Sequence, residues 1–98
     1  MDRQTVIATL RAHENELRQL GVIHVALFGS RAREQHHADS DIDIVVDIDL
    51  TARVSLWDFV GISHFIGDLF PVAVDVHERQ ALKPRILARA DQDAVHAF

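Results

Sequence analysis

The sequence has no cysteine, a single lysine and no long hydrophobic run, and each of these features excludes a class of proteins or sites. Without cysteine, neither disulfide bonds nor thiolate metal sites can form, and a reducing cytoplasm is the natural location. No apolar stretch approaches the roughly 20 residues that a helix needs to span a bilayer, so we expect a soluble protein without a membrane partner. The charged N-terminal segment lacks the pattern of a signal peptide.

Positive charge is scarce as well. The formal net charge is −5 at pH 7, and Lys83 is the only lysine. Non-specific nucleic-acid binding depends on lysine and arginine side chains that neutralise phosphates, so this composition argues against nucleic acid as the main ligand. The arginines gather locally, at Arg31 and Arg33 and again between Arg79 and Arg89. Clusters of this size suit the phosphates of one nucleotide better than a duplex.

The remaining composition is that of an ordinary folded protein, and we expect one domain over residues 1–98. Hydrophobic periodicity and turn residues predict alternating helices and strands. These are a helix over 3–20 that ends at Gly21, a strand over 22–28, a helical turn over 31–35, a strand over 41–48, a helix over about 53–69 capped by Thr51, a strand over 72–77 opened by Pro71, and a helix from Pro84. The last residues fit a short edge strand or a frayed end equally.

The two later strands each have one apolar face and one face with carboxylates. In 41–48, an apolar set alternates with an acidic one: Ile42, Ile44, Val46 and Ile48 against Asp41, Asp43, Val45 and Asp47. In 72–77, Asp75 alternates with valines. We therefore expect an α+β fold in which helices cover one face of a small mixed sheet and leave the other open and acidic. If the strands are neighbours, Asp41, Asp43 and Asp75 converge on the open face.

A glycine–serine pair precedes these carboxylates at a fixed distance. Gly29-Ser30 ends the first strand, and ten residues separate Ser30 from Asp41, with Asp43 two positions later. Glycine lets the backbone approach phosphates, and the serine hydroxyl and neighbouring N–H groups can donate to them. Carboxylates are hard oxygen ligands that suit Mg²⁺, which activates a hydroxyl and neutralises leaving pyrophosphate. The combination predicts a site for a nucleoside triphosphate and two divalent ions, with Asp41 and Asp43 as metal ligands.

Other polar residues extend or flank this site. Asp75 is expected to complete the metal site on the acceptor side and to help take the hydroxyl proton. Arg31 either steers phosphates or forms a surface ion pair, whereas for Arg33 the surface ion pair is favoured. A structural role is favoured for His77, two residues after Asp75. Two further carboxylates of the strand, Asp47 and Asp49, are expected to be solvated charges.

These residues resemble the defining motif of the minimal nucleotidyltransferases, the smallest members of the DNA polymerase β-like superfamily. The resemblance lies in LFGSRAR at 27–33, DSDIDI at 39–44 and VDV at 74–76. It implies a mixed sheet flanked by helices, Mg²⁺ dependence, and transfer of a nucleoside monophosphate from a triphosphate, most often ATP. It also assigns phosphate binding to Gly29 and Ser30. One departure is Glu34, which stands where family members usually have glycine and adds negative charge near the phosphates.

Many minimal nucleotidyltransferases pair with a helical HEPN-domain protein and act as the antitoxin that places AMP on a tyrosine of the toxin. This chain has no tyrosine, so such an acceptor has to come from another molecule. Trp57 and Phe65, within a segment that is apolar on more than one helix face, are candidates for a partner surface unless other helices bury them. Two alternatives stay open: an antitoxin that acts by occlusion without catalysis, and a small-molecule acceptor, for which the sequence supplies no pocket.

Overall fold

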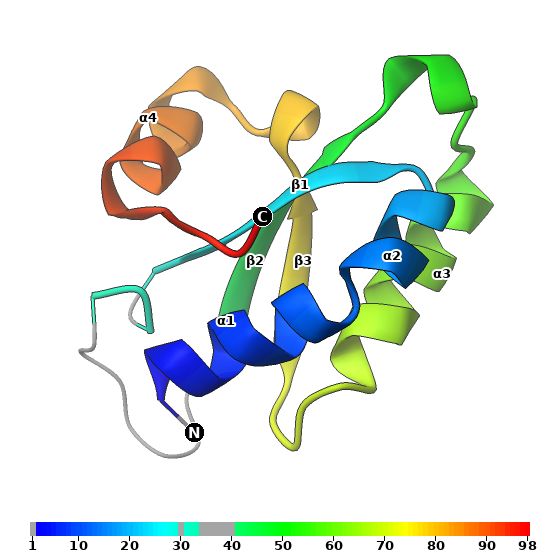
Figure 1. Ribbon diagram of the computed structural model, residues 1–98. Helices are drawn as coiled ribbons and strands as arrows, with labels where there is room; N and C mark the ends of the chain where they lie inside the picture. The colour runs from blue at the N-terminus through cyan, green and yellow to red at the C-terminus, as the bar shows by residue number, and fades with distance from the viewer. Residues whose placement is uncertain (1, 30, 34–40) are drawn as a thin grey trace.

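The described residues form a four-stranded mixed sheet with helices packed against it (Figure 1). The computed structural model describes residues 2–29, 31–33 and 41–98. In chain order the elements are α1 (Arg3–Ala12), α2 (Glu14–Gln19), β1 (Val22–Phe28), β2 (Ile42–Ile48), the 3-10 helix η1 (Leu50–Ala52), α3 (Leu56–Gly67), β3 (Val74–Glu78), the 3-10 helix η2 (Arg79–Ala81), α4 (Pro84–Asp93) and β4 (Val95–His96). The predicted α+β class is confirmed.

The strands lie in the order β3-β2-β1-β4. β2 runs parallel to β3, and β1 runs antiparallel to both β2 and β4. The two acidic strands are therefore neighbours, which is the condition for their carboxylates to converge. The end of the chain forms the edge strand that the sequence left undecided, with His96 opposite Ala26 of β1.

The main core lies between the sheet and the helices α1, α2 and α3, which cover one face (Figure 1). The apolar set of β2 points into it, and Ile42, Ile44 and Val46 are fully buried. Ile62 and Ile66 of α3 are fully buried against it, one helical turn apart. Within the described part of the chain, no helix has both the length and the apolar character that crossing a bilayer requires.

The opposite face of the sheet is partly covered by α4. Ala26 of β1, Val45 of β2 and Ala90 of α4 are buried outside the main core, and they line a small cavity of about 30 Å³. The expectation of helices on one face thus holds for α1 to α3, whereas α4 packs over the other face. The acidic face stays open at the end where Asp43 and Asp75 lie.

Several helix boundaries differ from the sequence-based prediction. The helix expected over 3–20 breaks at His13, whose backbone leaves the helical region and whose ring packs edge-on against Phe65 of α3. The helix expected from about 53 begins at Leu56, because Ser55 and Asp58 form a capping box there. Thr51 is not its cap but lies in η1. Pro84 is the first residue of α4, as predicted.

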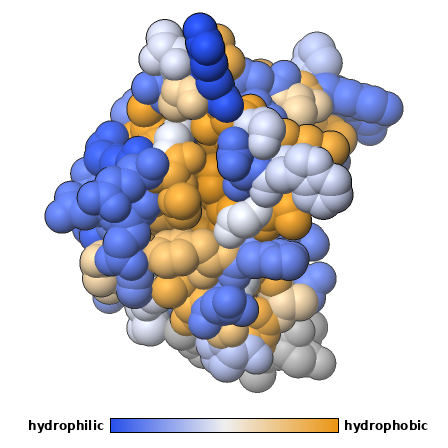
Figure 2. Space-filling view, turned by 90° about the vertical axis from the view of Figure 1, so that its right-hand side faces the viewer, coloured by the Kyte–Doolittle hydropathy of each residue, from blue (hydrophilic) through white to orange (hydrophobic). Residues whose placement is uncertain are grey.

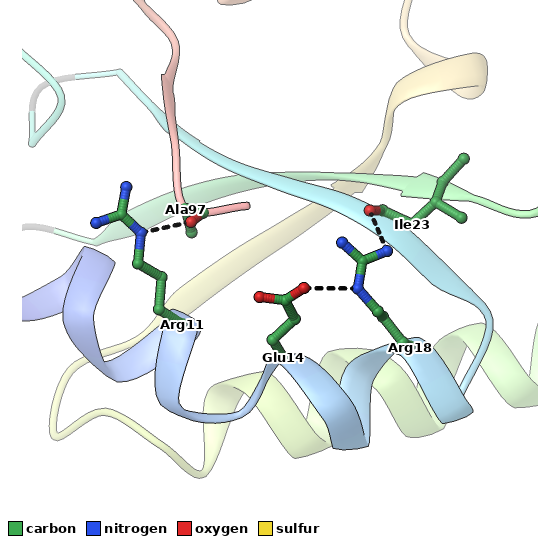
Figure 3. Close-up of polar contacts among 5 residues, drawn as sticks. All are labelled: Arg11, Glu14, Arg18, Ile23 and Ala97. Atoms are coloured by element: carbon green, nitrogen blue, oxygen red, sulfur yellow. Dashed lines mark hydrogen bonds and ion pairs between the residues drawn. The ribbon is translucent and has the colours of Figure 1, made fainter.

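Two arginines of the first helices bind backbone carbonyl groups of β1 and of the segment after β4 (Figure 3). Arg11 donates from Nε to the carbonyl oxygen of Ala97 at 2.6 Å, which ties α1 to the segment after β4. Arg18 donates from Nη1 to the carbonyl oxygen of Ile23 in β1 at 3.1 Å and from Nε to Glu14 at 2.7 Å. The first helices are thereby joined to β1 and to the segment after β4, and the last residue of β1 leads directly to Gly29.

Candidate active site

The parallel pairing of β2 and β3 brings two of the predicted carboxylates side by side. Asp43 and Asp75 are register partners on the two strands. Asp41 lies immediately before β2, and strand alternation places it on the same face as Asp43. Asp43 is half-buried, while Asp41 and Asp75 are exposed. The site therefore has one sheltered carboxylate with two accessible ones around it.

The surroundings of Asp43 disfavour its charged form. Burial raises the pKa of the Asp43 carboxyl, and the negative charge of Asp75 raises it further, with a smaller contribution from Asp41. The positive charges of His77 and Arg33 act in the opposite direction and lower this pKa, but they do not cancel the other effects. No described residue donates a hydrogen bond to the side chains of Asp43 or Asp75. This part of the fold holds like charges together without neutralising them.

Position 29 requires glycine both because of its backbone conformation and because Asp43 lies close to it. Its φ of +76° lies in the left-handed region that favours glycine. A Cβ at this position would lie 2.6 Å from Oδ2 of Asp43, closer than real Cβ atoms come. The reason is the strand register, since Phe28, the last residue of β1, is the partner of Asp43. The predicted phosphate ligand Ser30 and the departure at Glu34 lie outside the described residues.

The two arginines after Gly29 have different environments. Arg31 is fully buried, with 0% of its surface exposed, so the surface ion pair considered for it is wrong. A nucleotide-binding role for Arg31 stays a prediction, and it requires that a ligand reach a side chain inside the protein. Arg33 donates from Nη1 to Oδ2 of Asp93 at 2.7 Å, which confirms the ion pair favoured for it.

The comparisons with known proteins decide the family. A model of the nucleotidyltransferase domain matches residues 10–95. The chain belongs to the nucleotidyltransferase family.

One relative in this family is the protein adenylyltransferase MntA of Thermococcus cleftensis, which is 31% identical over 94 residues, covering 95% of this chain and 93% of the relative. A solved structure assigned to a minimal nucleotidyltransferase superposes with a TM-score of 0.81 at 28% identity, covering 97% of this chain and 95% of that one. A toxin–antitoxin structure with AMP-PNP, at 17% identity and a TM-score of 0.70, shares the fold over 100% of this chain and 73% of its own. The chain is thus a minimal nucleotidyltransferase domain, as the motif indicated.

Nucleotidyltransferases use divalent metal ions, and the donor set of this family member fits one. Among the described residues, no three carboxylate or imidazole groups are already close enough together to hold an ion. The chemistry nevertheless suits a hard cation, because an ion between Asp43 and Asp75 would offset the repulsion and the burial that raise the pKa of Asp43. The residues predicted to hold it are Asp41, Asp43 and Asp75.

The sequence did not reveal the cleft beside this site. A cleft of about 470 Å³ opens between the end of β1 and α4, and Phe28, Gly29, Arg33 and Arg89 are among the residues that line it. The arginine cluster was visible in the sequence, but nothing showed that Arg89 faces the end of the first strand. The helical spacing of α4 was visible in the sequence. It shows which side chains of α4 face the site only once the position of Gly29 is known.

His77, Asp47 and Asp49 have structural roles. The His77 ring packs edge-on against Phe28, with 5.5 Å between ring centroids, which supports the structural role favoured for it. Asp47 and Asp49 are not merely solvated. Asp47 is half-buried and accepts a hydrogen bond from Nε2 of Gln80 at 2.9 Å. Asp49 caps the start of η1, because its side chain accepts a hydrogen bond from the backbone N–H of Thr51.

Proposed function

We propose that this minimal nucleotidyltransferase uses Mg²⁺ to transfer AMP from ATP to a hydroxyl group of a protein partner. We further propose that the partner is a HEPN-type toxin, which the protein neutralises as a cytoplasmic antitoxin. The observation that carries the catalytic part is the pair Asp43 and Asp75, placed side by side next to Gly29 without a hydrogen-bond donor among the described residues. The relatives support a protein acceptor and a toxin partner, since MntA is described as a protein adenylyltransferase and a structural neighbour is a toxin–antitoxin structure with AMP-PNP.

In the proposed reaction, the acceptor oxygen forms a bond to the α-phosphorus of ATP and the bond to pyrophosphate breaks. Gly29 and Ser30 bind the phosphates through backbone N–H groups and the serine hydroxyl. Asp75, an exposed carboxylate of β3, helps to take the hydroxyl proton. Bound Mg²⁺ would supply positive charge that acidifies the hydroxyl and neutralises the leaving pyrophosphate.

An exposed apolar surface supports a protein partner. Three large side chains at η1 and the start of α3 are mostly exposed, with Leu50 at 78%, Leu56 at 75% and Trp57 at 82%. Figure 2, which views the molecule from the side of η1 and α3, shows apolar surface gathered between hydrophilic residues. Trp57 thus remains uncovered, whereas Phe65 is half-buried against His13. Exposed aromatic and aliphatic groups of this kind are typical of interaction sites.

The same surface favours a second candidate function, in which the protein occludes a toxin without catalysis. The two candidates differ in whether the acidic site matters. Occlusion needs the apolar surface alone, while transfer needs Asp43.

The experiment that tests the proposal uses ATP labelled at the α-phosphate, Mg²⁺ and a lysate of the source cells. Wild type, Asp43→Asn and Asp47→Asn are compared; Asp47 is the matched control because it lies on the same strand and face but is bonded to Gln80. We expect a discrete labelled protein with wild type and Asp47→Asn, and none with Asp43→Asn. Equal labelling by all three, or none by any, would contradict transfer at this site and favour occlusion.

A further inference from the structure

The cleft between β1 and α4 begins at the proposed reaction site. Its sheet side is formed by Phe28 and Gly29. Phe28 is the register partner of Asp43, and Gly29 lies so close to the Asp43 carboxylate that a Cβ at position 29 would come within 2.6 Å of its Oδ2. The Asp43 carboxylate thus lies next to two residues that line the cleft, so a ligand held at Asp43 is adjacent to the cleft. With a volume of about 470 Å³, the cleft has room for part of a nucleotide.

The helix side of the cleft contains one ion pair and one further cation. Arg89 and Asp93 are four residues apart on α4 and both line the cleft. Asp93 is bound to Arg33 at 2.7 Å, and this ion pair joins the last turn of α4 to the turn after β1. Arg89 is exposed, and no hydrogen bond or ion pair links it to another residue of the described ranges 2–29, 31–33 and 41–98. Its charge is therefore available to a ligand in the cleft.

We propose that this cleft binds the β- and γ-phosphates of the nucleoside triphosphate, with the Arg89 guanidinium as their ligand. The inference rests on the proposed function, which places the α-phosphate at the carboxylates. The tail of the triphosphate then extends away from a site rich in negative charge, on a chain whose formal net charge is −5. A guanidinium with several N–H donors matches phosphate oxygens in geometry and charge. Arg89 is thus a positioning residue for the leaving pyrophosphate.

The test measures nucleotide affinity rather than transfer. Binding of ATP and AMP in the presence of Mg²⁺ is measured by isothermal titration calorimetry for wild type, Arg89→Gln and Arg85→Gln. Arg85 is the matched control, since it is an exposed arginine of α4 that does not line the cleft. We expect Arg89→Gln to weaken ATP binding about tenfold or more and to leave AMP binding within about twofold, because AMP has no β- or γ-phosphate. Arg85→Gln should change neither by more than about threefold.

The outcomes separate this inference from the function on which it rests. Unchanged ATP binding by Arg89→Gln, or an equal loss in Arg85→Gln, overturns the role of Arg89 while the proposed function stands. An equal loss for AMP and ATP also overturns it, because the contact would then lie at the nucleoside or the α-phosphate. If wild type binds no ATP, both proposals fail. Arg89→Lys keeps the charge without the planar fork, and an intermediate loss of ATP affinity is expected should Arg89→Gln prove unstable.

Discussion

The acidic face of the sheet has two ends, and the carboxylates at these ends are treated in opposite ways. At the end near η2, Asp47 accepts a hydrogen bond from Gln80, and Asp91 forms a two-contact ion pair with Arg79. At the other end, Asp43 and Asp75 face each other with no such donor among the described residues. At one end, the fold thus supplies hydrogen-bond donors to the carboxylates. At the other end, the carboxylates repel each other.

The titration of the two ends shows the same contrast. The hydrogen bond and charge of Arg79 lower the pKa of the Asp91 carboxyl, whereas burial and the charge of Asp75 raise the pKa of Asp43. A carboxylate that stabilises a fold is expected to have a lowered pKa, and one held for a ligand can have a raised pKa. The comparison teaches that acidic composition alone does not identify a site. The absence of an internal partner among the described residues is what distinguishes the Asp43 end.

The largest expected difference is between variants that each remove one charge, one at either end of the face. Asp75→Asn should reduce nucleotide transfer by about a hundredfold or more, because a neutral amide is a poor metal ligand and cannot take the acceptor proton. Asp91→Asn should leave transfer within about threefold, since Asp91 bonds only within the structural end. Initial rates of label transfer to the acceptor protein measure both. A similar loss in the two variants would remove the functional distinction between the ends.

A smaller effect is expected where Gly29 makes room for Asp43. Gly29→Ala should lower the free energy of unfolding by about 1–3 kcal/mol, because alanine is strained in the left-handed conformation of this position and its methyl group would collide with the carboxylate. Gly61→Ala is the control, since a Cβ there meets nothing within 4 Å in the middle of α3. That variant should be unchanged or more stable by up to about 1 kcal/mol. Urea unfolding of the purified proteins gives both values, and equal values would argue against the close approach at Gly29.

The repulsion at the Asp43 end should appear as lost stability when metal is absent. Neutralising Asp43 with Asp43→Asn should raise the melting temperature of the metal-free protein slightly, by the equivalent of less than about 1 kcal/mol. The reason is that the fold raises the pKa of this carboxyl, so its ionised form opposes folding at neutral pH. Thermal unfolding in a chelator measures the shift. A lower melting temperature would indicate that the Asp43 carboxylate has a stabilising partner.

The smallest effect concerns the pH dependence of the Asp91 end. Because the pKa of Asp91 is lowered in the folded state, its ion pair contributes stability at pH values above the ordinary range of a carboxyl group. This contribution is lost as the pH falls through the lowered value. Asp91→Asn should therefore be slightly less stable than wild type near neutral pH and equal to it in strong acid. Melting temperatures over a pH series show the convergence, and a constant difference would rule out the ion pair as its cause.

The sequence was sufficient for the features that depend on local pattern. The alternation in 41–48 placed Asp43 on the polar face of its strand, and Pro84 marked the start of α4. The motif indicated that the strand with Asp43 is the next one after Gly29. The acidic faces of the two later strands were also evident, but their pairing was only a condition for convergence and comes from the structure.

The features that depend on distant contacts could not be predicted. The break at His13 coincides with the packing of its ring on Phe65, far away in the sequence. Arg33 and Asp93 are separated by 60 positions, so their ion pair has no local signal. The complete burial of Arg31 is likewise a result of tertiary packing, since arginine is ordinarily a surface residue.

The hydrogen bond from Arg11 to Ala97 spans 86 positions, and it implies an order of events during folding. The β1–β2 pair can form early, since its strands are close in sequence, but the outer edge of β1 stays open until the segment around 95–97 arrives. An open strand edge is a template for pairing with another chain. The strand that ends at Gly29 therefore passes through a period in which self-association competes with completion of the sheet, and a slow arrival of that segment would lower the yield of folded protein at high concentration.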